Sequence, residues 1–195
     1  MTAVVRFAAV GEVDDGLLTD AERARRDRLV VPADRAAYAA AHVLVRECAA
    51  ELLGVRAAEV VLVQRCPTCG GEDHGRPYVT GHGIHVSLSH TRGRVAAVAA
   101  TSRCGIDVEP VHTGRPPRGT LTDREAAWVA AQSDPGLPFT RLWVRKEALV
   151  KVGVGALEDA ARFGVLGPDG PADEVAGVRL TEWYDGAAVG AVALA

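Results

Sequence analysis

The chain has 195 residues, of which 48% are hydrophobic and 24% charged, so it can bury one substantial core or two smaller ones. Its formal net charge of −3 gives no overall basic field, so composition does not support nucleic-acid binding. Four unevenly spaced cysteines do not make a disulfide scaffold, and no segment has the length and apolarity of a signal peptide or a membrane span. We therefore expect a folded cytoplasmic protein with no nucleic-acid or membrane partner.

Helices are predicted in the first third of the chain. The segment Thr19–Glu22 has the spacing of a capping box and predicts a helix as far as about Leu29. Pro32 is expected to interrupt the helical pattern. An alanine-rich segment with apolar residues at helical spacing then predicts a long helix over 33–53, with Gly54 as its C-cap.

Short strands and two further helices are predicted beyond this point. A loop rich in cysteine, glycine and proline, from Arg65 to Pro77, separates the first strand from the others. The segment 178–194 has the pattern of a hairpin that turns at Asp185-Gly186. The remaining predicted strands cover 60–63, 84–89, 95–100 and 105–109, and the remaining helices cover 123–132 and a segment that includes 143–151.

Two segments of the first half have echoes in the second. Residues 45–47 (Val-Arg-Glu) resemble 144–147 (Val-Arg-Lys-Glu), and 93–100 resemble 186–193. A duplication would give two similar halves, 1–103 and 104–195, and would put acidic residues near the boundary, where ligand clefts often form. Such echoes also arise by chance in a chain rich in alanine and valine, so both explanations stay open.

An acidic strand and a later helix predict a cation site. In an extended Gly-Ile-Asp-Val-Glu segment, Asp107 and Glu109 point to the same side, as a hard cation requires. Glu147 and Lys151 are four residues apart and share one face of the predicted helix. The only lysines of the chain, Lys146 and Lys151, both lie in this helix. The alternative is an ordinary surface salt-bridge pair on a helix that lies beside an ordinary strand.

Four motifs in order resemble a known family. They are Gly75-Arg76-Pro77-Tyr78, Val86-Ser87-Leu88-Ser89-His90-Thr91, the strand 105–109, and the Trp-x-x-Lys-Glu-Ala segment that starts at Trp143. From about Leu18 to Leu157 the chain resembles a 4'-phosphopantetheinyl transferase of the surfactin-synthetase-activating type. The resemblance implies an α+β fold in which two similar halves with antiparallel sheets are related by a pseudo-twofold axis.

The resemblance also implies a reaction. Enzymes of this type move the phosphopantetheine arm of coenzyme A to a serine of an acyl or peptidyl carrier protein, in polyketide or nonribosomal peptide biosynthesis, and release 3',5'-ADP. The C-terminal half would hold Mg²⁺ with Asp107, Glu109 and Glu147, and Lys151 would contact the diphosphate. Glu147 is our first choice as general base. Two halves that supply one cleft suggest a monomer.

The N-terminal half would bind the nucleotide end of coenzyme A. By resemblance, Arg25 and Arg76 grip the 3'-phosphate, for which a guanidinium is well suited. Ser89 and His90 would hydrogen-bond the phosphates, and Gly75 and Pro77 would shape the loop that passes the adenine. For Arg25 a solvated helix face, and for His90 an exposed loop, are the structural alternatives.

Other interpretations remain open from the sequence. Cys66 and Cys69, with His74, His82 or His85, could form a small zinc site, although a second cysteine pair is missing. The glycine after Lys151 comes one residue earlier than in the family pattern, which leaves the path of that loop open. A non-catalytic module that binds coenzyme A or carriers, and a metal-dependent diphosphate hydrolase, are the two rival functions.

Overall fold

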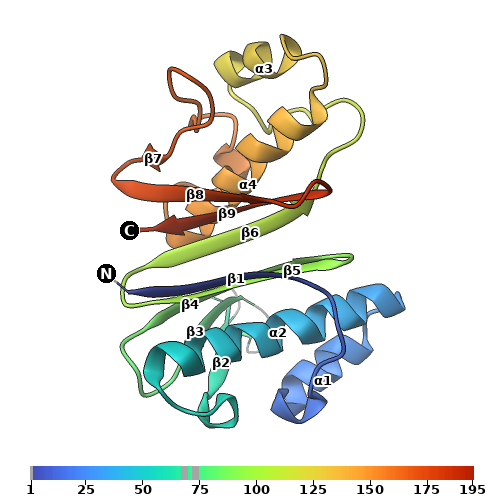
Figure 1. Cartoon of the computed structure of the whole chain (residues 1–195), viewed down its shortest axis with the longest axis vertical. Coiled ribbons are helices and arrows are strands. Elements are labelled where there is room, and N and C mark those ends of the chain that lie inside the picture. Colours follow the sequence, from blue (N-terminus) through green and yellow to red (C-terminus); the bar gives the residue numbers. More distant parts are fainter. Residues whose placement is uncertain (1, 67–69, 72–74) are drawn as a thin grey trace. The chain divides into compact units, whose positions relative to one another are not determined.

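A computed structural model describes residues 2–66, 70–71 and 75–195. The chain divides into two compact units, the first ending at Cys104 and the second beginning at Gly105. Each unit combines an antiparallel sheet with a long helix, and Figure 1 shows both kinds of element in each. The predicted α+β class with antiparallel sheets is confirmed.

The N-terminal unit contains a three-stranded sheet in the order β1-β5-β4 and a separate two-stranded sheet, β2-β3. The long helix packs mainly on β5 and β4. Its strands are β1 (Ala3–Ala9), β2 (Leu62–Arg65), β3 (Arg76–Val79), β4 (His85–Thr91) and β5 (Arg94–Ala100), and its helices are α1 (Asp20–Asp27) and α2 (Pro32–Leu53).

Small side chains bring α2 close to its sheet. Ala97 and Ala99 of β5 are fully buried in one core cluster with Val45, Cys48 and Ala49 of α2. Because alanine and cysteine leave little volume between the backbones, an alanine-rich helix can cover an alanine-rich strand without a void. The alanine run that predicted a helix therefore also specifies the surface on which that helix packs.

The predicted break between the two helices is confirmed and lies directly before Pro32. Pro32 itself begins α2 at its first turn, where a missing N–H costs nothing. The strand β1 was not predicted. It pairs antiparallel with β5 from Ala3↔Ala100 to Ala9↔Arg94, so its stability comes from a partner that lies far along the chain. The predicted capping box of α1 and the C-cap at Gly54 are confirmed.

The C-terminal unit is built on a four-stranded sheet in the order β6-β9-β8-β7. Helix α4 packs across β9, and the predicted hairpin is confirmed, with Gly186 at φ +92° in its turn. The elements of this unit are β6 (Cys104–Pro110), α3 (Asp123–Ala130), α4 (Gly136–Val152), β7 (Glu174–Val175), β8 (Val178–Tyr184) and β9 (Ala188–Leu194).

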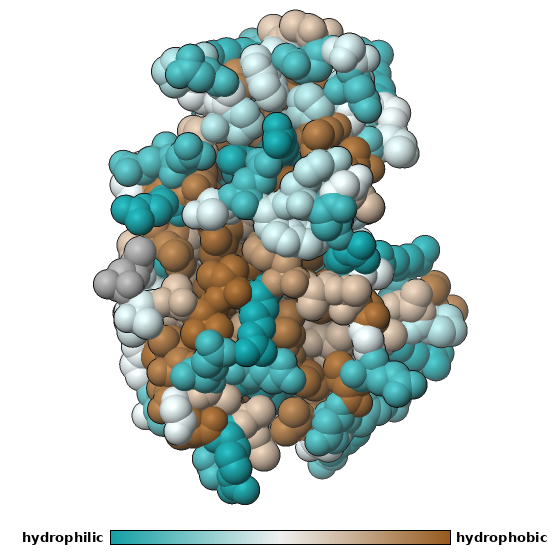
Figure 2. Space-filling model, in the orientation of Figure 1, coloured by the Kyte–Doolittle hydropathy of each residue, from teal (hydrophilic) through white to brown (hydrophobic). Residues whose placement is uncertain are grey.

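Hydrophilic and hydrophobic residues are both spread over the viewed face of each unit (Figure 2). Within the described ranges, no helix combines the length and apolarity that a membrane crossing needs.

Candidate functional site

Gly105 lets α4 lie directly against β6. A Cβ at this position would come within 2.1 Å of the Ala148 carbonyl oxygen and 2.8 Å of the Val152 nitrogen, so any larger residue would push the helix away from the strand. The glycine that opens the acidic strand therefore brings Glu147 and Lys151 of α4 next to that strand.

Lys151 and Asp107 form the central contact between these two elements. The Lys151 Nζ lies 2.8 Å from the Asp107 Oδ1 and donates a second hydrogen bond of 2.9 Å to the carbonyl oxygen of Ile106. Asp107 is buried, whereas 29% of the Lys151 side chain is exposed. The ammonium is thus held on the strand at its tip but remains accessible to a ligand.

Glu109 and Glu147 complete a cluster of three carboxylates. Burial, followed by the negative charges of Asp107 and Glu147, raises the pKa of Glu109 to about 7, although Lys151 opposes the rise. Burial and the charge of Asp107 also raise the pKa of Glu147, again against Lys151. Two carboxyl groups whose negative form is disfavoured in this way indicate a place that gains from an added cation.

These side chains fit Mg²⁺ by their chemistry rather than by their present arrangement. Among the residues that the structure describes, no group of three or more Asp, Glu, His or Cys side chains is arranged to hold a metal ion. The Lys151 ammonium is paired with the Asp107 Oδ1 at 2.8 Å. Three carboxylates that face a single ammonium still offer the oxygen donors that a hard cation requires.

A pocket of about 360 Å³ lies beside Glu109 and is entirely within the C-terminal unit. Phe139 and Trp143 from α4 form part of its wall, with stacked rings 6.3 Å apart, and His112 meets Phe139 edge to face at 4.9 Å. Phe139 was not predicted to be a site residue, and Trp143 was predicted only as part of a motif. The pocket offers an aromatic surface next to the carboxylate cluster.

The second lysine of the motif helix has a different role. Lys146 is fully buried, forms an ion pair of 2.7 Å with Glu125, and donates to the carbonyl oxygens of Ala160 and, at 2.8 Å, Phe163. Glu125 in turn accepts from the Val165 nitrogen at 2.7 Å. Lys146 therefore ties α4 to α3 and to the segment after α4, and does not face a ligand.

In the N-terminal unit, the predicted Gly-Arg-Pro segment lies at the edge of a pocket. Gly75 has φ +102°, and a Cβ there would lie 2.4 Å from the Arg65 carbonyl oxygen, so the turn requires glycine. Arg76 and Pro77 line a pocket of about 380 Å³. Three further residues of this pocket that could contact a ligand were not assigned to coenzyme A from the sequence: Arg65, Tyr78 and His85.

The other predicted residues of this unit do not line that pocket. Arg25 is exposed on α1, Ser89 is buried in β4, and His90 is exposed on the same strand, edge to face with Tyr38 at 6.0 Å. Their roles thus stay predictions.

Part of the possible zinc site lies outside the described residues, namely Cys69 and His74. His82 and His85 are exposed. The backbone of Cys66 donates a hydrogen bond of 2.9 Å to the Gly71 carbonyl oxygen. The zinc alternative therefore gains no geometric support from the part of the site that is described.

The early glycine after Lys151 has a structural explanation. Gly153 has φ +98° and caps α4, and its nitrogen donates to the carbonyl oxygens of Leu149 and Val150. Gly155, at φ +75°, lies against the Phe163 ring. The early position of Gly153 thus ends α4 shortly after Glu147 and Lys151.

Comparison with known proteins identifies a domain in this part of the chain. Residues 103–189 match the model of the 4'-phosphopantetheinyl transferase superfamily. The matched segment contains β6 and α4, and with them Asp107, Glu109, Glu147 and Lys151. No curated protein matches the chain.

Proposed function

We propose that the protein transfers the 4'-phosphopantetheine arm of coenzyme A to a serine of an acyl or peptidyl carrier protein, in a Mg²⁺-dependent reaction that releases 3',5'-ADP. We further propose the surfactin-synthetase-activating subtype, a monomeric state and carriers of polyketide or nonribosomal peptide biosynthesis.

One observation carries the proposal. Within the segment that matches the superfamily, three carboxylates and one accessible ammonium lie where β6 meets α4. Diphosphate chemistry needs this combination, because negative charge on the substrate must be neutralised while the reacting groups are held in line.

Asp107, Glu109 and Glu147 would hold the magnesium ion. When bound, Mg²⁺ supplies neutralisation of the diphosphate charge and fixes the orientation of its oxygens. The raised pKa of Glu109 and Glu147 supports this assignment, since a cation at the cluster removes the cost of ionising them.

Glu147 is our candidate general base. It would accept the proton of the carrier serine, directly or through one water, as the serine Oγ forms a bond to the β-phosphorus. The bond from that phosphorus to the bridging oxygen breaks, and the electron pair leaves with 3',5'-ADP. A carboxyl group whose pKa is raised by burial and by Asp107 is better matched to proton transfer near neutral pH than an ordinary glutamate.

Lys151 would stabilise the charge that develops on the diphosphate. Its ammonium is a compact point charge on a partly exposed side chain, so it could exchange its contact with Asp107 for one with a phosphate oxygen. The aromatic pocket beside Glu109 gives room for the transferred arm.

The N-terminal unit would bind the nucleotide end of coenzyme A. Arg76 lines a pocket with a second guanidinium, that of Arg65, and with the Tyr78 ring, which suits a phosphate beside an aromatic base. Pro77 shares this pocket and Gly75 fixes its turn. Arg25, Ser89 and His90 would supply further phosphate contacts.

Mass spectrometry separates this proposal from its two rivals. The protein is incubated with coenzyme A, Mg²⁺ and an apo carrier, and the masses of the carrier and of the nucleotide product are recorded. We expect a carrier that has gained the arm, together with 3',5'-ADP. Nucleotide release without a modified carrier would indicate a diphosphate hydrolase. Coenzyme A binding that persists without Mg²⁺, and no product at all, would indicate a non-catalytic module.

A further inference from the structure

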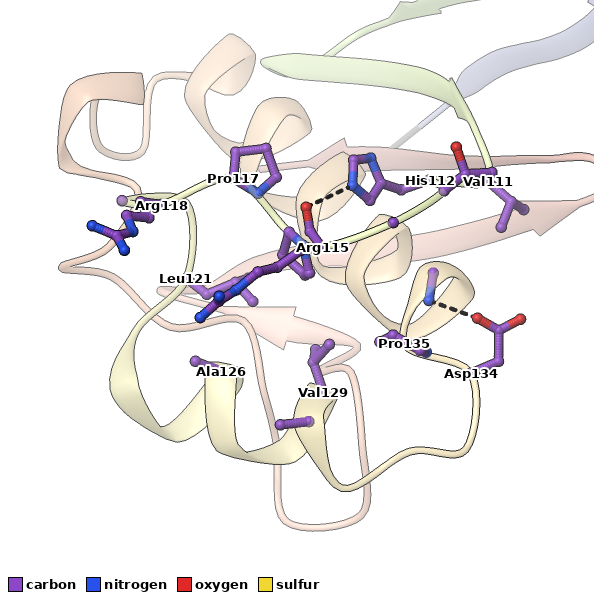
Figure 3. Close-up of a pocket in the computed structure, with 16 residues that line it drawn as sticks. Val111, His112, Arg115, Pro117, Arg118, Leu121, Ala126, Val129, Asp134 and Pro135 are labelled. Carbon is purple, nitrogen blue, oxygen red and sulfur yellow. Dashed lines mark hydrogen bonds between the residues drawn. The ribbon is translucent and has the colours of Figure 1, made fainter.

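A second, larger cavity lies in the C-terminal unit (Figure 3). Its volume is about 930 Å³, and its walls come from the connection 111–121, from α3 and from the start of α4. This volume falls within the roughly 300–1,000 Å³ typical of sites for small organic ligands. Neither the carboxylate cluster nor Lys151 lines it, although it shares Val111, His112, Thr113 and Pro117 with the pocket beside Glu109.

The walls of the cavity are mainly apolar. Val111 and Leu121 come from the connection, and Ala126 and Val129 come from α3 (Figure 3). Val129 is almost fully buried, so it belongs to the core and forms a fixed wall. A ligand that fills this space must therefore have an apolar body.

Close packing fixes the wall opposite α3. A Cβ at Gly136 would lie 2.3 Å from the His112 carbonyl oxygen, so the connection touches the first turn of α4. The His112 nitrogen donates to the Thr140 Oγ1 at 2.9 Å, and the Asp134 Oδ1 accepts from the Gly136 nitrogen at 3.0 Å. These contacts fix the connection against the start of α4.

Two arginines at the cavity carry uncompensated charge. Neither Arg115 nor Arg118 forms an ion pair with any residue in the described ranges. By contrast, Arg141, Arg145 and Arg162 of the same unit each pair with a carboxylate at 2.7–2.9 Å. Both exposed guanidiniums belong to the lining of one apolar cavity, which is the arrangement that an anionic head group requires.

We propose that this cavity binds a small amphiphilic anion, namely an apolar chain or ring system that ends in a carboxylate or phosphate. The apolar part occupies the space between the connection and α3, and the anionic group lies between Arg115 and Arg118. The proposal does not depend on the transferase activity, because it uses neither the carboxylate cluster nor Lys151.

Straight-chain fatty acids are the probes. Octanoate, decanoate and dodecanoate, each below its micellar concentration, are titrated into the full chain by isothermal calorimetry. We expect saturable 1:1 binding whose affinity rises about fourfold for each added methylene until the cavity is full. Decanol, which has the chain without the charge, should bind about tenfold more weakly than decanoate.

Three variants locate the binding site. The double substitution Arg115→Gln, Arg118→Gln should weaken decanoate about tenfold and leave decanol unchanged. Ala126→Phe, which fills the cavity from α3, should abolish the binding of both probes. Arg179→Gln is the matched control, because Arg179 is an exposed arginine of β8 that does not line the cavity. Thermal unfolding of each variant verifies that it is folded.

Several outcomes would overturn the proposal. They are no saturable binding below millimolar probe, affinity that does not depend on chain length, and an equal loss in Arg179→Gln. Competition by coenzyme A would make the cavity part of the transferase site. Loss of apo-carrier binding in Ala126→Phe, without any fatty-acid binding to the parent protein, would assign the cavity to protein docking. Either of these last two results also excludes a separate small-molecule site.

Discussion

The two units use the same device to hold a short helix on a long one. In each, the glutamate of a capping box on the short helix forms a buried ion pair with a cation of the long helix. Glu22 of α1 pairs with Arg46 of α2 at 2.7 Å, and Glu125 of α3 pairs with Lys146 of α4 at the same distance. This correspondence aligns the two long helices residue by residue and favours duplication over chance, which the sequence left open as alternatives.

With the helices aligned, the next positions differ in charge. After Arg46 come Glu47 and, four residues later, Glu51, and both pair with Arg6 of β1. These three side chains are each more than 40% exposed. The N-terminal unit thus has a solvated cluster in which a cation already lies on both carboxylates, and such a cluster contributes little to stability.

The corresponding positions of the C-terminal unit carry an excess of negative charge. After Lys146 come Glu147 and, four residues later, Lys151, while the strand contributes Asp107 and Glu109. One ammonium faces three carboxylates, Asp107 is buried, and the pKa of Glu109 is raised to about 7. One scaffold therefore supports a satisfied surface cluster in one unit and an electrostatically frustrated one in the other, and frustration of this kind is typical of ligand sites.

The largest expected effect is on turnover. Asp107→Ala or Glu147→Ala should lower the rate of carrier modification by more than about a hundredfold, because each removes a ligand and a charge that act in the transition state. Glu47→Ala, at the corresponding helix position, should leave the rate unchanged. Product is quantified by carrier mass, and circular dichroism verifies the fold. Activity retained in either C-terminal variant would refute the ligand assignment.

The shared ion pairs should govern stability rather than chemistry. Lys146→Met leaves Glu125 buried without its cation, which should cost about 3–5 kcal/mol of unfolding free energy. Arg46→Met should have a similar effect through Glu22. In urea unfolding, the double variant Glu125→Gln, Lys146→Met should recover part of the loss, since it removes both charges. A Lys146→Met protein as stable as the parent would show that the pair is not a structural element.

Stability without a divalent cation should depend on pH through Glu109. Its pKa in the folded protein lies above the ordinary value of 4.5 because of burial and the charges of Asp107 and Glu147, with Lys151 opposing. The folded state therefore binds the proton more tightly than the unfolded state does. This contribution to stability is complete below pH 4.5 and is lost as the pH rises through about 7.

Thermal unfolding with and without Mg²⁺ measures this effect. Relative to Glu109→Gln, the parent protein should lose stability between pH 5 and pH 8 in a chelator. Added Mg²⁺ should stabilise the parent most at the upper end of that range, where Glu109 is ionised. A parent and variant with parallel pH profiles would contradict the raised pKa.

Sequence patterns of a few neighbouring residues predicted much of this architecture. Contacts between residues that are far apart in the chain could not be predicted from the sequence. The capping box at Thr19, the C-cap at Gly54 and the turn at Gly186 each depend on a few neighbouring residues, and all three are confirmed. The burial of Lys146 depends on Glu125 and on carbonyl groups more than ten residues away. Sequence alone therefore could not separate the structural lysine from Lys151.

The candidate site shows the same division. Alternation along the strand and spacing along the helix predicted that Asp107, Glu109, Glu147 and Lys151 are available to one another, and the raised pKa values agree with that proximity. The ion pair between Lys151 and Asp107 was not predicted, because it requires the close approach that Gly105 permits. The cavity behind the connection 111–121 was not predicted either, since its walls come from three separate elements.

The smallest expected effect concerns the binding role that we propose for the N-terminal unit. Arg76→Ala should raise the KM for coenzyme A about tenfold and leave kcat nearly unchanged, because a contact to the 3'-phosphate is the same in the ground and transition states. Arg56→Ala is the control, since Arg56 is an exposed arginine of the same unit that pairs with Glu59 and does not line the pocket. Steady-state kinetics with varied coenzyme A separates the two constants. A fall in kcat at unchanged KM would move Arg76 from binding to chemistry, and the division of labour between the units would then have to be abandoned.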